Sequence, residues 1–287
     1  MSQNNPNVPV GIIVSGAAGR MGRRIVAIAG ESTNGKSTYR VLAALDVPQC
    51  PVLGQDAGKL AGIGDLGVLV VATLPADLRT GAGGGSGGSR PVVIDFSAPA
   101  GTRKLLPEAV SRGLGMMIGT TGLTPDDHAQ IDQAARTIPV LQATNTSLGV
   151  NVLLKLVADA ARQLGSDYDI EIVEAHHNQK KDAPSGTALS LAESICKATG
   201  RSLEKDLVHG REGKESLRRK GSIGMHAVRM GDVVGEHTVY FGAVGERIEL
   251  RHVASNRDTF VRGALRAAAW LSNQKPGRYT MADVLGL

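Results

Sequence analysis

The stretch VPVGIIVSGAAGRMG, residues 8–22, decides the fold. It begins as a short apolar run typical of a buried strand and ends in a loop with glycines at 16, 19 and 22. A helical pattern follows from Arg20 to Gly30, and a second apolar run, YRVLAALDV, covers residues 39–47. This succession predicts a βαβ unit, which opens many parallel sheets.

The glycines stand between the first predicted strand and the first predicted helix. At such a junction they permit a tight turn and the close approach of a pyrophosphate, whose charge the helix N–H groups stabilise. Asp46, near the end of the second strand, supplies a carboxylate for an adenosine ribose. The alternative is a purely structural turn. The residues predicted to hold a dinucleotide are Gly16, Ala17, Ala18, Gly19, Arg20, Met21, Gly22 and Asp46.

A second glycine motif lies close by. GESTNGKS, residues 30–37, matches the phosphate-loop pattern G-x-x-x-x-G-K-[ST]. A phosphate loop follows a strand and opens a helix, whereas this segment follows a helix and precedes a strand. We therefore interpret the match as accidental.

Further along the chain, the pattern changes near residue 148. Before it, apolar runs at 67–72, 91–97, 115–120 and 138–145 alternate with helical patterns, which predicts a parallel sheet covered on both faces. After it, a helix at about 149–164 leads into YDIEIVEAHH, and three later runs resemble successive strands of an antiparallel or mixed sheet. The tail from Phe260 is helical again.

The fold class expected is therefore α/β. A Rossmann-type nucleotide domain with a parallel sheet spans residues 1–147 and is completed by 258–287, and an α+β domain with a mixed sheet spans 148–257. The glycine-rich segment TGAGGGSGGSR, residues 80–90, is expected to be a flexible surface loop without an assigned function.

Composition narrows the class of protein. The 287 residues are 42% hydrophobic but only 3% aromatic, and the net charge is +5 with basic residues scattered along the chain. Without aromatic stacking platforms, this charge favours a small polyanionic ligand over nucleic acid. The sequence shows neither a membrane-length apolar run nor a secretory signal, and Cys50 and Cys196 lack metal or redox spacing, so we expect a cytoplasmic protein.

The stretch EAHHNQKKDAPSGTA, residues 174–188, carries the densest chemistry. His176 and His177 end a strand and should point in opposite directions, which argues against a shared metal ion. Lys180 follows in an irregular segment, and Ser185, Gly186 and Thr187 open a helix whose free N–H groups suit a carboxylate. The stretch thus offers a proton donor, a cation and an anion cradle. Together with the glycine loop, it indicates hydride transfer to a small carboxylated substrate; the alternative is a capped helix beside a solvated charge run.

These motifs also resemble a known family. VSGAAGRMG, FSAPAGT, IGTTG, TNTSLGVNV, EAHHNQKKDAPSGTA, GDVVGEHTV and HVASNRDTF follow, in order, the signatures of 4-hydroxy-tetrahydrodipicolinate reductase, also called dihydrodipicolinate reductase, of bacterial lysine biosynthesis. The resemblance covers nearly the whole chain. It implies an NADH- or NADPH-dependent reductase of a cyclic dicarboxylate in the diaminopimelate pathway, and a homotetramer formed through the sheet of the second domain.

The resemblance also implies roles for single residues. His176 would be the proton donor, Lys180 a second acid or polarising cation, and His177 with the 185–187 turn would hold the substrate carboxylates. The nicotinamide pocket would be lined by Gly119, Thr120, Thr121, Thr144, Asn145, Thr146 and Ser147.

Departures from the family pattern concern the cofactor. Some members carry an arginine directly after the acidic residue, but Asp46 is followed by Val47 and Pro48, which favours NADH. Arg20 or Lys36 could still meet the phosphate of NADPH, and Thr146 stands where some relatives have an aromatic residue. Two other classes stay open at this point: a different Rossmann oxidoreductase of amino-acid metabolism, and a non-catalytic dinucleotide sensor.

Overall fold

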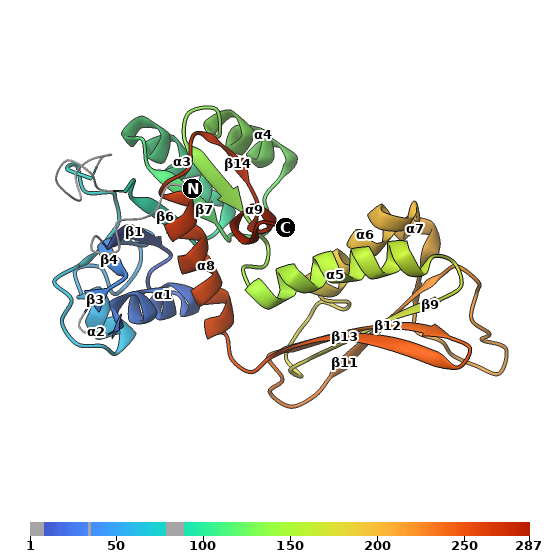
Figure 1. The fold of residues 1–287 in the computed structure, drawn as a ribbon. Coiled ribbons are helices and arrows are strands. Elements are labelled where there is room, and N and C mark those ends of the chain that lie inside the picture. Colours follow the sequence, from blue (N-terminus) through green and yellow to red (C-terminus); the bar gives the residue numbers. More distant parts are fainter. Residues whose placement is uncertain (1–8, 34–35, 79–88) are drawn as a thin grey trace. The chain divides into compact units, whose positions relative to one another are not determined.

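The chain divides into two compact units in a computed structural model that describes residues 9–33, 36–78 and 89–287 (Figure 1). The first unit contains the residues up to Ser147 together with Phe260–Gly286, and the second contains Leu148–Thr259. Most of the glycine-rich segment at 80–90 and the side chain of Lys36 lie outside the described residues.

The first unit is a doubly wound parallel sheet. Its strands are β1 (Val10–Ser15), β4 (Tyr39–Leu45), β5 (Val70–Val71), β6 (Val92–Asp95), β7 (Gly115–Ile118), β8 (Pro139–Gln142) and β14 (Gly277–Tyr279), besides a small hairpin of β2 (Ser32–Thr33) and β3 (Lys36–Ser37). Its helices are α1 (Arg20–Gly30), α2 (Ala57–Ala61), α3 (Pro99–Arg112), α4 (Pro125–Ala134), α8 (Asp258–Leu271) and α9 (Met281–Leu285). The strand order is β14-β8-β7-β6-β1-β4-β5. From β1 the chain first adds β4 and β5 on one side and then β6, β7, β8 and β14 on the other, so the topological switch point, where such sheets bind ligands, lies between β1 and β6.

Both faces of this sheet are buried, as the near-continuous apolar strands predict. On one face Ile13, Val93 and Met116 pack in a cluster with residues of α3 and α4. The alternating residues Ile12 and Ile94 point to the other face and are equally buried, and Figure 1 shows α1 and α8 on that side. The sheet is therefore a rigid middle layer that fixes the loops at its edge.

The second unit packs two long helices on one face of a mixed sheet (Figure 1). Its elements are α5 (Leu148–Leu164), β9 (Asp169–His176), α6 (Gly186–Thr199), α7 (Leu203–Asp206), β10 (Leu207–His209), β11 (Ile223–Arg229), β12 (Gly235–Ala243) and β13 (Glu246–Ala254). The sheet order is β10-β11-β9-β12-β13, with β9 parallel to β11 and antiparallel to β12. Ile170 and Ile172 of β9 and Phe241 of β12 pack against α5 and α6 in one buried cluster.

The α/β class and the mixed second sheet predicted from the sequence are confirmed. Helix α1 has the predicted bounds, and the 30–37 motif lies between α1 and β4, as expected for an accidental match. The run at 67–72 yields only the two-residue strand β5, and sequence patterns did not predict the short elements α2, α7, β10 and β14.

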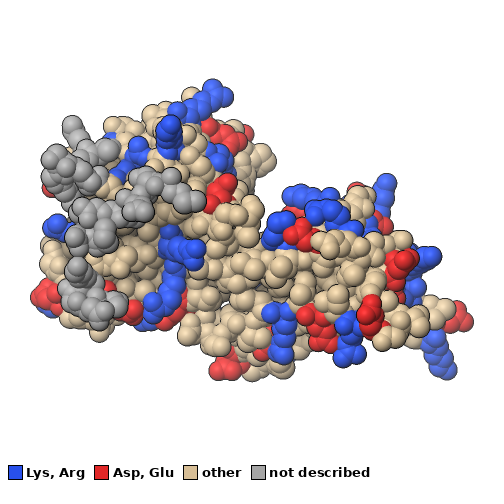
Figure 2. Space-filling model, viewed as in Figure 1, with Lys and Arg blue, Asp and Glu red and all other residues tan. Residues whose placement is uncertain are grey.

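The charged residues do not gather in a continuous basic stripe on the face that Figure 2 displays, where basic and acidic side chains are interspersed on both units. Among the residues the structure describes, none of the helices combines the length and the apolarity needed to cross a lipid bilayer.

The core of the second unit provides a stability test. Phe241 is fully buried, so Phe241→Ala leaves a cavity between the sheet and its helices and should lower the free energy of unfolding by about 3–5 kcal/mol. Val244, in the turn after the same strand, is fully exposed, and Val244→Ala should change the free energy of unfolding by less than about 0.5 kcal/mol. Urea unfolding followed by circular dichroism measures both; equal effects would contradict the assigned core.

Candidate active site

The glycine loop of the first unit is fixed by the end of the neighbouring strand. The N–H groups of Gly16 and Ala17 donate to the carbonyl of Leu45, at 3.0 and 2.9 Å, and Gly16 adopts a φ of 78°. A left-handed φ is strained for residues with a side chain, so glycine is required there. A Cβ on Gly16 would also lie 2.6 Å from the carbonyl oxygen of Phe96.

Asp46 lies beside this loop, as the sequence predicts for a ribose-binding carboxylate. Its Oδ2 accepts the N–H of Ala18 at 2.8 Å, and its Oδ1 accepts the N–H of Val47 at 2.9 Å. The carboxylate therefore ties the end of β4 to the glycine loop. It also lines a cavity of about 240 Å³ together with Ser15, Gly16 and Lys104, a cation that sequence patterns did not single out.

The other predicted cofactor residues lie at the carboxyl ends of strands of the same sheet. Gly119 follows β7, and its missing side chain makes room for Phe96, whose ring carbon would lie 2.3 Å from a Cβ at 119. Thr120 donates to Asp95 Oδ2 at 3.1 Å, whereas Thr121 is exposed. Asp95 is fully buried and also accepts hydrogen bonds from Ser97 and Thr102, so it organises this edge although the sequence analysis missed it.

The loop from Thr144 to Ser147 follows β8 and is held by α8. The hydroxyl of Thr146 donates to the carbonyl of Phe260 at 2.6 Å, and a Cβ on Gly263 would lie only 1.7 Å from the Thr146 carbonyl oxygen. Asn145 Oδ1 accepts the N–H of Ser147 at 2.9 Å. The Thr146 side chain is thus buried and anchors this loop to α8.

Arg20, another predicted cofactor residue, is exposed at the start of α1.

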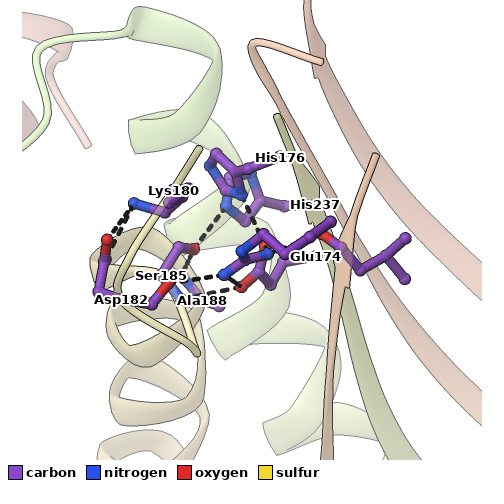
Figure 3. Close-up of polar contacts among 9 residues, drawn as sticks. Glu174, His176, Lys180, Asp182, Ser185, Ala188 and His237 are labelled. Carbon is purple, nitrogen blue, oxygen red and sulfur yellow. Dashed lines mark hydrogen bonds and ion pairs between the residues drawn. The ribbon is translucent and has the colours of Figure 1, made fainter. Parts of the chain in front are cut away.

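In the second unit, strand register brings side chains from three strands to one place (Figure 3). Residues of β9 alternate between faces, so Glu174 and His176 point to the same helix-covered face as Ile170 and Ile172. In the ladders, His176 pairs with Arg229 of β11, and Glu174 pairs with His237 of β12.

Glu174 is the centre of this group. Its side chain is fully buried, and its Oε2 lies 2.6 Å from His176 Nδ1. Arg229 donates to both carboxylate oxygens at 2.8 Å, and the N–H of Ser185 donates to Oε1 at 3.0 Å. Burial raises the pKa of Glu174, but the hydrogen bonds from Arg229, His176 and Ser185 outweigh burial and hold that pKa below its ordinary value.

His176 is poised for proton transfer. Because Nδ1 faces the Glu174 carboxylate, this nitrogen carries a proton, and Nε2 is the atom whose proton can be exchanged. Burial lowers the pKa of His176, Glu174 acts in the opposite direction, and the charges of Lys180 and Arg229 lower it further. The net pKa lies below the ordinary histidine value, so the neutral ring predominates at pH 7 and the imidazolium, when it forms, is a stronger acid than that of a free histidine.

Lys180 lies in the segment between β9 and α6. Its ammonium forms an ion pair with Asp182 at 2.8 Å, and its side chain is 20% exposed, so the cation is partly screened from water yet accessible. His177 is half-buried, and the two adjacent histidines differ in burial as expected for opposite directions. Within the described parts of the chain, no three histidine, cysteine or acidic side chains are placed to hold a metal ion.

Helix α6 begins where the sequence pattern predicts a helix, and its start is capped. Ser185 is the N-cap, its Oγ accepts the N–H of Ala188 at 3.2 Å, and it lies 3.1 Å from His237 Nε2. Because the Ser185 N–H is already paired with Glu174, the space for an anion lies beside Gly186, where a Cβ would meet open space. Burial and the nearby charge of His176 lower the pKa of His237 to about 4, so this ring is neutral at pH 7.

The structure brings the predicted residues His176 and Ser185 together on Glu174, which sequence reasoning missed. Sequence reasoning also missed Arg229 and His237. Glu174 was inside the quoted stretch, and its position two residues before His176 was the available signal, since a period of two puts both on one face. Arg229 and His237 are 53 and 61 residues beyond His176 and carry no local signal of proximity.

A glycine loop at the switch point of a doubly wound sheet is typical of dinucleotide-binding domains, and the second unit adds a buried histidine and a lysine close in sequence to a helix start. Comparisons with known proteins identify the family. The model for the amino-terminal part of dihydrodipicolinate reductase matches residues 10–146, and that for its carboxyl-terminal part matches residues 149–285. The chain belongs to the dihydrodipicolinate reductase family.

A relative in sequence supports the same family, and two solved structures share the fold. The 4-hydroxy-tetrahydrodipicolinate reductase of Alkalilimnicola ehrlichii is 47% identical over 96% of this chain and 98% of its own length. Among solved structures, the dipicolinate-bound dihydrodipicolinate reductase from Paenisporosarcina sp. TG-14 shares the fold with a TM-score of 0.70 at 21% identity, covering 96% of this chain and 99% of that one. A Thermus thermophilus dehydrogenase solved in complex with NAD and UDP-GlcNAcA matches with a TM-score of 0.50 at 16% identity, covering 94% and 97%.

The glycine loop provides a binding test. A Cβ on Gly22 would lie 2.1 Å from the Gly16 carbonyl oxygen, so Gly22→Ala must displace α1 from the loop and should weaken cofactor binding by about tenfold or more, equivalent to at least about 1.4 kcal/mol. In Gly30→Ala, at the far end of the same helix, the new methyl meets only the flexible Cδ1 of Ile63, and binding should stay near wild type. Titration of NADH fluorescence measures both; wild-type affinity in a folded Gly22→Ala protein would contradict the assigned loop.

Proposed function

We propose that this protein reduces 4-hydroxy-tetrahydrodipicolinate to tetrahydrodipicolinate with a nicotinamide cofactor, a step on the route to diaminopimelate and lysine. The observation that carries the proposal is the buried His176, held by Glu174 beside Lys180 and the start of α6, in a chain that belongs to the dihydrodipicolinate reductase family. A dianionic ring needs cations and helix N–H groups, and reduction of its imine needs a proton at the neighbouring atom.

The reaction divides the chemistry between cofactor and protein. Loss of water from the hydroxylated ring gives a conjugated imine. The reduced nicotinamide supplies a hydride and an acid supplies a proton, and together they reduce the carbon–carbon double bond of this conjugated system while the product keeps its C=N bond. We propose that His176 Nε2 gives the proton that the ring takes up, because Nδ1 is committed to Glu174. Lys180 polarises the ring system or acts as a second acid, with its ammonium oriented by Asp182.

The substrate carboxylates are proposed to bind at His177, Gly186 and Thr187. The first turn of α6 presents the positive end of a helix of 14 residues, and the open space at Gly186 admits an oxygen atom close to the backbone. Ser185 belongs to this seat as its cap. The dipicolinate bound to the Paenisporosarcina reductase is a dicarboxylate and supports this substrate class.

The cofactor is proposed to bind along the carboxyl edge of the first sheet, at the loop 16–22 and Asp46, with the nicotinamide near 119–121 and 144–147. The Thermus dehydrogenase, which shares the fold, is in complex with NAD, and this supports a nicotinamide cofactor for the present protein. We propose a preference for NADH, because Asp46 lines the cavity beside the glycine loop and its negative charge would oppose a 2′-phosphate. Lys104 in the same cavity works in the other direction, so NADPH should still react.

A homotetramer built through the sheet of the second unit is proposed for the cytoplasmic enzyme. The sheet face opposite α5 and α6 carries Val228 and Val253, which are 38% and 48% exposed in the single chain. A sheet face with exposed apolar residues favours burial against another copy.

The direct test supplies the condensation product of pyruvate and aspartate semialdehyde, generated in situ by the preceding enzyme, and follows absorbance of NADH or NADPH. Oxidation that depends on this product is the expected result. If both cofactors bind and neither is consumed, the reductase proposal fails and a non-catalytic sensor is the better account. If another amino-acid intermediate is reduced instead, the protein is a different Rossmann oxidoreductase.

Substitution of the proton donor should stop turnover without releasing the cofactor. His176→Gln and Lys180→Ala should each lower kcat by roughly 10²–10⁴-fold, the usual contribution of a positioned acid, while the dissociation constant for NADH is unchanged. His209→Gln, an exposed histidine of the same unit, is the matched control and should keep wild-type kinetics. Steady-state kinetics with NADH binding measures all three; unchanged turnover in His176→Gln would refute the catalytic role.

Neutralising Asp46 should shift cofactor choice. Asp46→Asn keeps an acceptor for the loop but removes the charge that faces a 2′-phosphate, so the NADPH-to-NADH ratio of kcat/KM should rise by about tenfold, or about 1.4 kcal/mol. Asp65→Asn removes an exposed carboxylate of the same unit that pairs with Lys59, and the ratio should stay the same. A ratio that moves equally in both variants would show that only net charge matters.

A further inference from the structure

We propose that Glu174 is the positioning residue of the active site, and that one buried carboxylate holds both the proton donor His176 and the start of the carboxylate-binding helix α6. The inference rests on the proposed function and extends it. Glu174 is fully buried and contacts no open space, so its role is exerted through the groups it binds and does not require contact with substrate.

The geometry divides the carboxylate between two tasks. Oε2 lies 2.6 Å from His176 Nδ1, and Oε1 accepts the Ser185 N–H at 3.0 Å. Each oxygen also accepts one N–H of Arg229, at 2.8 Å. The bidentate Arg229 contact thus fixes the plane of the carboxylate, and the remaining acceptor of each oxygen points to one component of the site (Figure 3).

The contact with Nδ1 decides which nitrogen of His176 reacts. With a proton on Nδ1, the neutral ring has a free lone pair on Nε2, and the imidazolium has its transferable proton there. Gly235 keeps space beside this atom, because a Cβ at 235 would lie 3.1 Å from Nε2. The opposite tautomer would leave the buried Nδ1 lone pair facing a carboxylate, which is unfavourable.

Arg229 compensates the negative charge of the buried Glu174 carboxylate. A buried carboxylate without a partner is strongly unfavourable, and the paired guanidinium offsets most of that desolvation cost. Arg229 also donates to the carbonyl of Asp182 at 2.7 Å, and Asp182 pairs with Lys180. The network therefore continues from Glu174 to the segment that carries the second proposed acid.

The charge of Glu174 also sets the proton affinity of His176. The groups facing this ring are Glu174 on β9, Arg229 on β11, His237 on β12 and Lys180 on the following segment, with Ser185 at the helix start. Glu174 is the anion among them that raises the pKa of His176, whereas Lys180 and Arg229 lower it. Removal of the carboxylate charge should therefore make the imidazolium a stronger acid.

The test is ¹⁵N NMR of the histidines in the intact, substrate-free protein across a pH titration, with His176→Gln identifying the His176 signals. In the wild type, the neutral ring should carry its proton on Nδ1. In Glu174→Gln, the pKa of His176 should fall by roughly one pH unit or more and the other tautomer should appear. The descending limb of the kcat/KM profile should move to lower pH by the same amount.

Asp127→Asn is the matched control. Asp127, in the first unit, is also a buried carboxylate, and Arg103 donates to both of its oxygens, at 2.5 and 2.9 Å. The hydrogen bonds from Arg103 and Thr124 hold the pKa of Asp127 below its ordinary value. Asp127→Asn therefore removes a comparable buried ion pair and should leave the His176 signals and the pH profile unchanged.

The outcomes are separable. An Nε2-protonated neutral ring in the wild type overturns the inference even if Glu174→Gln does not fold, and so does an unshifted His176 pKa in a folded Glu174→Gln protein. The predicted NMR result in a protein that does not oxidise NADH supports the positioning role and refutes the proposed reaction. Turnover with the predicted substrate but no NMR shift supports the reaction and refutes the positioning role.

Discussion

The ion pair of Glu174 and Arg229 is the constraint on which the second unit's chemistry depends. A carboxylate with no exposure is tolerated inside a protein only when its lone pairs are filled, and here Arg229, His176 and the Ser185 N–H fill them. Two of these donors, His176 and the Ser185 N–H, belong to the proposed site, so the hydrogen bonds that stabilise the buried charge also orient the reactive groups. The strand register makes these contacts possible, because it places side chains of β9, β11 and β12 on one helix-covered face.

In the first unit, too, carboxylates hold the loops of the proposed site in place. Asp46 accepts the Ala18 N–H and so holds the glycine loop, and the buried Asp95 accepts hydroxyl groups from the loops after β6 and β7. In both units a carboxylate in or just after a strand fixes a backbone segment at the end of a strand: Asp46 holds the loop after β1, and Glu174 holds the start of α6, which follows its own strand β9. The rigid part of each site is therefore the sheet, and the binding loops are tied to it by charge-assisted hydrogen bonds.

Local sequence patterns predict much of the fold and part of the candidate site, but they do not predict contacts between residues distant in sequence. Glycines at 16, 19 and 22 between an apolar run and a helix specify a local geometry, and so does the turn at 185–187 before a helical pattern, so the sequence predicts the starts of both α1 and α6. The ladder that places Arg229 beside His176 depends on how strands distant in sequence align, which no local pattern records. The pairing of the Ser185 N–H with Glu174 was invisible for the same reason, and it confines the proposed carboxylate seat to the residues after the cap.

The central claim is that the groups around His176 and the start of α6 form a seat for two carboxylates. Calorimetric titration of the intact protein with pyridine-2,6-dicarboxylate and, separately, with pyridine-2-carboxylate tests it most directly, because the two rings differ by a single carboxylate. A charge-assisted hydrogen bond contributes about 1.5–3 kcal/mol, so the account predicts that the dicarboxylate binds at least about tenfold more tightly. Equal affinities for the two compounds, or binding of neither, would contradict it.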